Sequence, residues 1–199
     1  MPRLKQQDRE ATLDQTRTRF LDAAAEEIAR SGYDAANINS ISLAGGFAKG
    51  TIYNYFSSKR ELMFALIETT AARHVEFISS AVLVEPDAEN RLERLFTAGF
   101  EFVQQHLSPA RVMITTLYGP DEEFKARLFA AYQPAFRLVE EEILAPGIRE
   151  GVFREVDPQP AAILLMTFYL GTASQVNEEG RLYLDPRQIS NFLLNGLRR

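Results

Sequence analysis

The chain has 199 residues and a formal net charge of −5 at pH 7, and 46% of its residues are hydrophobic, which is enough for a packed globular core. It contains no cysteine, which excludes disulfides, thiolate catalysis and cysteine-ligated zinc. Two histidines, His74 and His106, offer little material for a metal site. We therefore predict no metal and no cofactor.

Neither a secretory signal nor a membrane span is visible in the sequence. Residues 1–19 are polar and charged, without the apolar stretch of a signal peptide. The most apolar run, residues 161–170, is shorter than the roughly 20 residues that cross a bilayer. These features predict a cytoplasmic protein with no membrane partner.

The charge is distributed unevenly along the chain. Residues 1–60 hold nine Lys or Arg and seven Asp or Glu, a net of +2, whereas residues 61–199 hold thirteen and twenty, a net of −7. No acidic residue occurs from Ala35 to Arg60. A surface that meets DNA phosphates has to avoid carboxylates, because like charges repel at contact. The gap supports a nucleic-acid partner, although chance alone also produces gaps of this length.

The first predicted elements are two helices joined by a short link. Apolar residues recur every four positions from Phe20 to Ile28 and predict a helix over about residues 13–30. Gly32 ends this helix as a C-terminal glycine cap. Asn37 is placed to cap a short second helix, since its side-chain oxygen can accept from backbone N–H groups two or three residues on.

A third helix is predicted over about residues 49–56, and Ser57 or Ser58 is placed to cap a long fourth helix. Further helices follow, each bounded by proline, glycine or aspartate, at about residues 90–106, 109–118, 121–149, 160–178 and 186–197. Pro134 and Pro146 are expected to kink the longest of them or to end it early. No strand is predicted, so the fold class is all-α.

Two short helices separated by a glycine-containing turn fit the helix-turn-helix pattern, in which the second helix enters the major groove of DNA. Ile38, Ile41 and Phe47 would pack this unit against the first helix. The remaining side chains can donate to phosphates or base edges, and one glycine permits close approach. This outer face consists of Lys49, Gly50, Thr51, Tyr53, Asn54, Tyr55 and Lys59.

The run GFAKGTIYNYFSSK at residues 46–59 resembles the recognition-helix signature of TetR/AcrR-type bacterial regulators. The run GYDAAN at residues 32–37 resembles that family's link between its first two helices. The motif match covers about residues 16–66, and the rest of the chain matches in length and helix number alone.

The resemblance implies an all-α subunit of about nine helices. A flexible tail at residues 1–12 would precede a three-helix helix-turn-helix domain at residues 13–60. A larger domain at residues 61–199 would bind a ligand and dimerise through its last two helices, which would form a four-helix bundle with their partners.

The resemblance also assigns roles by position. The base-contacting positions of the family fall on Lys49, Gly50 and Tyr53, and its phosphate-contacting positions on Thr51, Asn54, Tyr55 and Lys59. Asn37 and Asn39 complete the candidate DNA-binding set. Asn39 stands where a basic residue is frequent in the family, which weakens one expected phosphate contact.

Other interpretations of these residues stay open at this point. Tyr53 and Phe56 could be core aromatics. This is the favoured interpretation for Phe56, whereas the motif disfavours it for Tyr53. The glycine-rich run at residues 45–51 lacks the order GxxxxGK[ST] and a preceding strand, which argues against a phosphate loop. Arg3, Lys5 and Arg9 could form an arm that reaches the minor groove, but a disordered tail is the simpler interpretation.

The C-terminal part is rich in phenylalanine, and ligand pockets are mostly apolar with a few placed polar groups. The candidate ligand-binding residues lie on helices expected to face one another and are Phe100, Val103, Met113, Leu117, Phe129, Tyr132, Phe136 and Phe168. Any one of them could instead belong to the core. His74 and His106 could each orient a ligand or lie on the surface.

Residues 161–170 are apolar nearly all round, and Ile189, Phe192, Leu193 and Leu197 form an apolar stripe on the last helix. A helix that is apolar on all sides has to be buried on all sides. This pattern predicts a homodimer interface, with burial inside one subunit as the alternative.

The sequence thus predicts a dimeric repressor that binds a palindromic double-stranded DNA operator and is released by a small apolar or amphipathic effector. The alternatives are a helical interaction module and an all-α enzyme that has lost DNA binding. No acid–base constellation or metalloprotease motif supports an enzyme, and we predict no catalytic residues.

Overall fold

The computed structural model describes residues 6–175, 181 and 183–198, and it confirms the all-α class. The α-helices are α1 (Gln6–Ser31), α2 (Ile38–Ala44), α3 (Lys59–Val82), α4 (Ala88–Gln105), α5 (Leu107–Leu117), α6 (Glu122–Arg137), α7 (Ala145–Arg149), α8 (Pro158–Ala173) and α9 (Pro186–Leu197). A 3-10 turn, η1 (Thr51–Asn54), follows α2, and a π-helical segment, η2 (Leu138–Leu144), joins α6 to α7.

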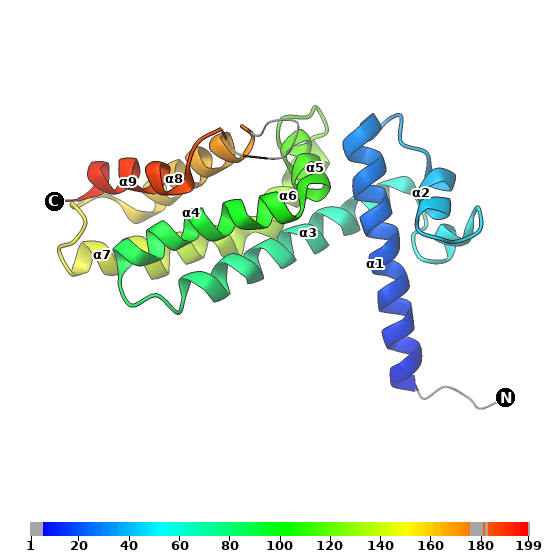
Figure 1. Ribbon diagram of the computed structural model, residues 1–199, viewed down its shortest axis with the longest axis horizontal. Coiled ribbons are helices and arrows are strands. Elements are labelled where there is room, and N and C mark those ends of the chain that lie inside the picture. The colour runs from blue at the N-terminus through cyan, green and yellow to red at the C-terminus, as the bar shows by residue number, and fades with distance from the viewer. Residues whose placement is uncertain (1–5, 176–180, 182, 199) are drawn as a thin grey trace.

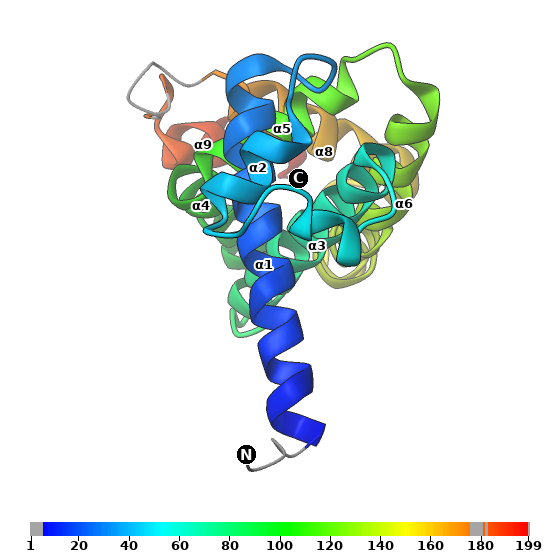
Figure 2. The same ribbon diagram turned by 90° about the vertical axis from the view of Figure 1, so that its right-hand side faces the viewer.

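The helices form a small unit at one end of the molecule and a larger body beside it. In Figure 1, α1 and α2 lie at one end of the long axis, and α7 and the C-terminus lie at the other. Helix α3 begins in the small unit and runs into the larger body, along α4 and α6. Figure 2 looks onto the small unit and shows α1 crossing in front of the body, with its N-terminal part extending beyond it.

The two parts share buried residues. The core of the small unit contains Phe20, Ile41 and Ile52, and it continues into the larger body through Val112 of α5 and Phe124 of α6. Burying a side chain of this size contributes roughly 1.5–3 kcal/mol. The small unit is therefore packed against α5 and α6, and a shift of either helix acts directly on it.

Three predicted boundaries differ from the structure. Helix α1 begins at Gln6 and not at about residue 13, so residues 6–12, predicted as tail, are helical. Helix α6 continues through Pro134, although this residue has no backbone N–H to donate. The π-helical segment follows four residues later, and the helical run continues to Arg149. The proline therefore does not end the helix early. The helix predicted at residues 160–178 ends earlier, at Ala173, with Ser174 as its C-terminal cap. Arg3 and Lys5 lie outside the described residues.

Within the described residues, no helix is long and apolar enough to cross a membrane. The same residues contain no group of His, Cys, Asp and Glu side chains that could hold a metal ion.

Candidate DNA-binding surface and effector groove

The start of the helix-turn-helix is fixed by side-chain caps. Gly32 ends α1 with a φ of +80°, as the sequence predicts. The Asn37 side-chain oxygen accepts from the backbone N–H groups of Asn39 at 2.9 Å and Ser40 at 3.3 Å, which confirms its role as the cap of α2. The buried Ser42 hydroxyl donates to the Ala48 carbonyl over 2.7 Å and ties α2 to the turn that follows.

The third element is shorter than predicted. In place of a helix over residues 49–56, the chain forms the 3-10 turn Thr51–Asn54. Gly50 precedes it at a φ of +82°, a left-handed conformation that interrupts any helix begun at Lys49. The prediction of a full helix was wrong because too few residues remain between Gly50 and the cap of α3 at Ser58, whose hydroxyl accepts from the Glu61 N–H.

Residues in this turn alternate between the core and solvent. Ile52 and Phe56 are buried against α1, where the Phe56 ring lies edge-on to Phe20, so Phe56 is a core aromatic. The Tyr53 side chain is 53% exposed and is not part of the core. Tyr55 is half-buried, with its ring 5.2 Å from that of Phe20. The turn therefore presents Tyr53 outward on a rigid apolar base.

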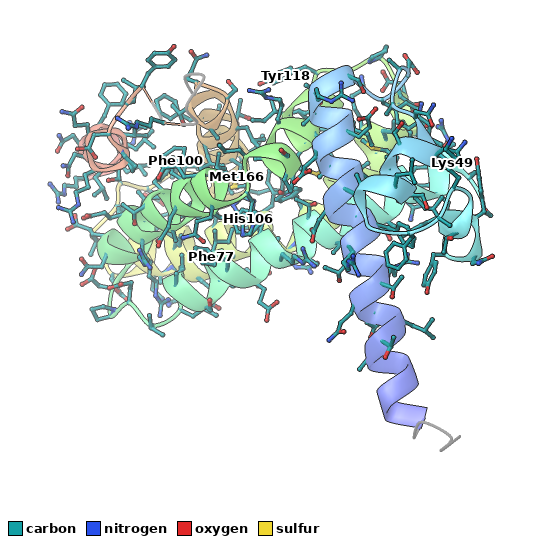
Figure 3. The ribbon with its side chains drawn as sticks, turned by 45° about the vertical axis from the view of Figure 1, so that its right-hand side comes forward. Lys49, Phe77, Phe100, His106, Tyr118 and Met166 are labelled. Carbon is teal, nitrogen blue, oxygen red and sulfur yellow. The ribbon has the colours of Figure 1, made fainter. Side chains whose placement is uncertain are left out.

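The predicted DNA-binding residues do not all have equal freedom. Exposed side chains belong to Asn37, Asn39, Lys49, Tyr53 and Asn54, whereas Gly50, Thr51, Tyr55 and Lys59 are half-buried. The structure places Lys49 at the end of the molecule that carries the turn (Figure 3).

Lys59 is already engaged within the subunit. Its ammonium group donates to the Asp34 carbonyl over 2.9 Å and lies 4.8 Å from the centre of the Tyr33 ring. These contacts connect the start of α3 to the link between α1 and α2. A phosphate contact by Lys59 would compete with them.

Two cations that the sequence analysis did not select lie beside the turn. The Arg17 guanidinium lies 4.5 Å from the centre of the Phe56 ring and donates to the Tyr55 carbonyl over 3.4 Å. The Arg19 guanidinium lies 4.7 Å from the centre of the Phe47 ring. Arg17 and Arg19 lie three residues and one residue before the core position Phe20 on α1. This spacing was the signal that could have identified them.

Arg60, at the start of α3, links the small unit to the larger body. Its guanidinium donates to both Asp121 carboxylate oxygens, at 3.0 and 3.1 Å, and to the Glu123 carboxylate. It also lies 4.6 Å from the centre of the Phe124 ring. The pKa of Asp121 is lowered, first by the N–H of Phe124 that it caps and then by Arg60. This cluster holds the N-terminus of α6 against α3.

An apolar groove opens between α5, α6 and α8. Its outer part has a volume of about 570 Å³ and is lined by Leu117, Tyr118, Phe129, Gln133, Phe136, Arg137, Glu140, Gln159, Ala162, Ile163, Thr167 and Leu170. An inner chamber of about 40 Å³ shares Leu117, Phe129, Phe136 and Leu170 with the outer part. The groove is thus apolar inside, with polar side chains at its mouth.

The predicted ligand-binding residues separate into three places. Met113, Leu117, Phe129, Tyr132 and Phe136 line the inner chamber. Phe100 and Val103 lie in the core of the larger body, where Figure 3 shows Phe100 among the helices. Phe168 lies in a groove between α8 and α9. The sequence pattern could not separate these places because all eight residues are large, apolar and at helical spacing.

Behind the inner chamber, His74 is buried on α3. Its Nδ1 lies 3.0 Å from the Tyr132 hydroxyl and its Nε2 lies 3.0 Å from the Tyr169 hydroxyl. Burial, with a smaller effect from His106, lowers the pKa of His74 to about 4, so the ring is neutral at pH 7. His106 is exposed and lies against the Phe102 ring.

Helices α8 and α9 leave a large apolar face uncovered within the subunit. Leu164 and Phe192 are each 70% exposed, and the rings of Phe168 and Phe192 stack with centres 6.3 Å apart. Complete burial of these residues inside one subunit, the alternative left open above, is therefore excluded. Exposed apolar area of this kind marks an interaction site.

The DNA-binding end of the chain is similar to a known family of proteins. The family model described as bacterial regulatory proteins of the tetR family matches residues 20–66, the segment that runs from α1 through the turn into α3. The chain belongs to the TetR family. Its all-α fold, with the helix-turn-helix at one end, agrees with that of the family's solved members.

Among relatives of this TetR-family chain is the HTH-type transcriptional activator FasR of Mycolicibacterium smegmatis, 28% identical over 59% of this chain and 54% of FasR. The chain thus aligns with about half of the length of FasR. Among solved structures, FadR from Bacillus subtilis in complex with stearoyl-CoA has a TM-score of 0.78 at 22% identity, covering 89% of this chain and 95% of FadR. AibR, in complex with isovaleryl coenzyme A and operator DNA, has a TM-score of 0.73 at 22% identity, covering 92% and 98%. These two likenesses establish the fold.

Proposed function

We propose that the protein is a homodimeric transcriptional repressor that binds operator DNA and is released by an acyl-CoA or a similar amphipathic acyl compound. The observation that carries the proposal is the match of residues 20–66 to the tetR family together with an exposed, acid-free turn at one end of the molecule. Cytoplasmic location and the absence of enzymatic activity belong to the same proposal, since the relatives are named as regulators.

The DNA-facing surface consists of the turn and its neighbours. Lys49 and Tyr53 are exposed and are assigned to bases, with Gly50 allowing the backbone to approach. Thr51, Asn54 and Tyr55 are assigned to phosphates. Arg17 and Arg19 add positive charge beside the turn, where they offset the missing cation at Asn39. We assign Lys59 to phosphate as well, at the expense of its bond to the Asp34 carbonyl.

Dimerisation would use the apolar face of α8 and α9. A second copy that packs on Leu164, Phe168 and Phe192 would bury the largest uncovered apolar area of these helices. The face lies at the end of the molecule away from the turn (Figure 1). Two turns in one dimer would have to lie about 34–36 Å apart to enter successive major grooves.

The effector would occupy the groove between α5, α6 and α8. A volume of about 570 Å³ lies within the range of small-molecule sites. The acyl chain would lie on Leu117, Phe129 and Phe136, and the polar head would lie at the mouth, where Arg137 is exposed. The structures of FadR and AibR, each solved with an acyl-coenzyme A, favour this class of effector.

The effector would act through α6. One end of this helix lines the groove, and the other end is held to the start of α3 by Arg60. Movement of α6 would be passed to α3, which begins five residues after the turn ends. An effector that favours the non-binding arrangement shifts the population by its differential affinity for the two states. We assign DNA binding to residues 13–60 and effector binding and dimerisation to residues 61–199, although α3 contributes to the cores of both parts.

The experiment is a fluorescence anisotropy titration of labelled duplex DNA from upstream of the protein's own gene. We expect binding that weakens with salt, and a loss of about 1–3 kcal/mol in Tyr53→Ala from removal of a base contact. Tyr183→Ala is the matched control, because Tyr183 is 70% exposed and lies beyond α8. Equal affinity of both variants and the unchanged protein would contradict the assigned surface.

A further inference from the structure

The buried histidine of α3 is held between two tyrosines from other helices. His74 is 5% exposed, and its two ring nitrogens contact the hydroxyls of Tyr132 on α6 and Tyr169 on α8. A neutral imidazole has one donor and one acceptor nitrogen, so one tyrosine donates and the other accepts. Its ring also stacks on Phe102 of α4, with centres 4.5 Å apart. Four helices therefore meet at one side chain.

The two tyrosines belong to the lining of the inner chamber of the effector groove. Both line the inner chamber, whose other walls, including Met113 and Met166, are apolar. The chamber has a volume of about 40 Å³, which is close to the space of one water molecule in the liquid, about 30 Å³. An acyl chain that extends beyond the outer groove therefore has to displace side chains of this lining, in which the two tyrosines are the only ones with a hydroxyl group.

The surroundings of the two tyrosines differ. The Tyr169 ring lies against Gly99 of α4, where a Cβ atom would come within 2.6 Å of it, and it stacks on Phe100 with centres 5.2 Å apart. Tyr132 is only partly buried, and it lies two residues before Pro134, where the helix lacks a backbone donor. Tyr132 is thus less tightly enclosed than Tyr169.

We infer that Tyr132, His74 and Tyr169 form a gate that makes the response of the protein depend on the length of the effector's acyl chain. A short chain occupies the outer groove and leaves the gate closed. A long chain enters the chamber, moves Tyr132 away from His74 and leaves a buried ring nitrogen without a partner. Helix α3 then shifts to restore a hydrogen bond to His74. This inference rests on the proposed effector site.

The position of His74 explains how the gate would reach the DNA. His74 lies fifteen residues after Lys59 on α3, about 22 Å along the helix at 1.5 Å per residue. The same helix begins five residues after the turn ends and carries Arg60. His74 is therefore a positioning residue that couples the depth of the groove to the recognition turn.

The test separates effector binding from DNA release in the full-length protein. Octanoyl-, dodecanoyl- and stearoyl-CoA are titrated by calorimetry, and their effect on the dissociation constant for DNA is measured by anisotropy. We expect all three to bind, with stearoyl-CoA weakening DNA binding by about tenfold or more and octanoyl-CoA having little effect. Equal DNA release at equal occupancy by all three would overturn the inference.

Tyr132→Phe removes the hydroxyl and keeps the ring, so one ring nitrogen of His74 lacks its partner even without a ligand. We expect stearoyl-CoA to bind this variant at least as tightly as it binds the unchanged protein. Without stearoyl-CoA the variant should bind DNA more weakly than the unchanged protein, and adding stearoyl-CoA should change its DNA affinity less. Tyr183→Phe removes one hydroxyl from an exposed side chain outside the groove and should leave both properties unchanged. An unchanged chain-length dependence in Tyr132→Phe would refute the gate.

A spectroscopic measurement on the unchanged protein covers the case in which Tyr132→Phe does not fold. The chain has two histidines, so nitrogen-15 spectra of labelled histidine resolve His74, with His106 as an internal reference. Stearoyl-CoA should move the ring signals of His74, and octanoyl-CoA should not. DNA release without any change at His74 would overturn the gate alone, and no binding of any acyl-CoA would overturn the proposed effector class with it.

Discussion

The buried state of His74 predicts a specific loss of stability in mild acid. The pKa of its ring is about 4 in the folded protein, chiefly because of burial, against about 6.5 for an unperturbed histidine. Between these values the unfolded chain binds more protons than the folded one, so the free energy of unfolding rises with pH through this window and falls as the solution is acidified. Lowering the pH from 7.5 to 5 is expected to remove about 2 kcal/mol through this residue.

The assay is urea unfolding at a fixed protein concentration, followed by circular dichroism at several pH values. Other groups also titrate in this range, so the measured quantity is the difference in pH dependence between the unchanged protein and His74→Gln. That variant should be less stable throughout, and its stability should fall less on acidification. His106→Gln replaces the exposed histidine, which is the smaller cause of the lowered pKa of His74, and should keep most of the slope. Parallel curves for His74→Gln and the unchanged protein would refute a neutral, buried His74.

Three further variants test the couplings between helices. Arg60→Gln removes the ion pairs to Asp121 and Glu123. Because Arg60 is partly exposed, the melting temperature should change little, whereas DNA release by stearoyl-CoA should weaken. Unchanged release would exclude Arg60 as the link between α6 and α3. Leu164→Glu with Phe192→Glu places two charges on the uncovered apolar face and should give monomers in sedimentation velocity; a persistent dimer would exclude α8 and α9 as its interface. Gly99→Ala brings a Cβ within 2.6 Å of the Tyr169 ring and should lower the free energy of unfolding by roughly 1–3 kcal/mol in urea titrations; a neutral effect would mean that this ring is not held there.

Local signals predicted the DNA-binding end well. The cap at Asn37, the glycine stop at Gly32 and the apolar contacts of Ile41 depend on residues close in sequence, and the structure has all of them. The third helix was predicted too long because one glycine conformation, at Gly50, outweighs the helical pattern around it. Such a conformation is not visible in residue spacing.

The larger body was harder to predict in detail. The helices were found from their prolines, glycines and aspartates, but the groove, the core and the outer face of α8 use the same apolar residue types. His74 and Tyr169 are 95 residues apart, and their hydrogen bond exists only because the fold brings the two side chains together. Long-range pairing of this kind decides which aromatic residues face a cavity, and one sequence does not contain that information.

The central claim is that binding of DNA at the turn and of an acyl compound in the groove are coupled in one protein. The most direct measurement is the dissociation constant for labelled duplex DNA from upstream of its own gene, compared with a scrambled duplex of equal length, with and without stearoyl-CoA. We predict tighter binding to the upstream duplex and a weakening of about tenfold or more when stearoyl-CoA is added. Equal affinity for both duplexes, unaffected by stearoyl-CoA, would contradict the account.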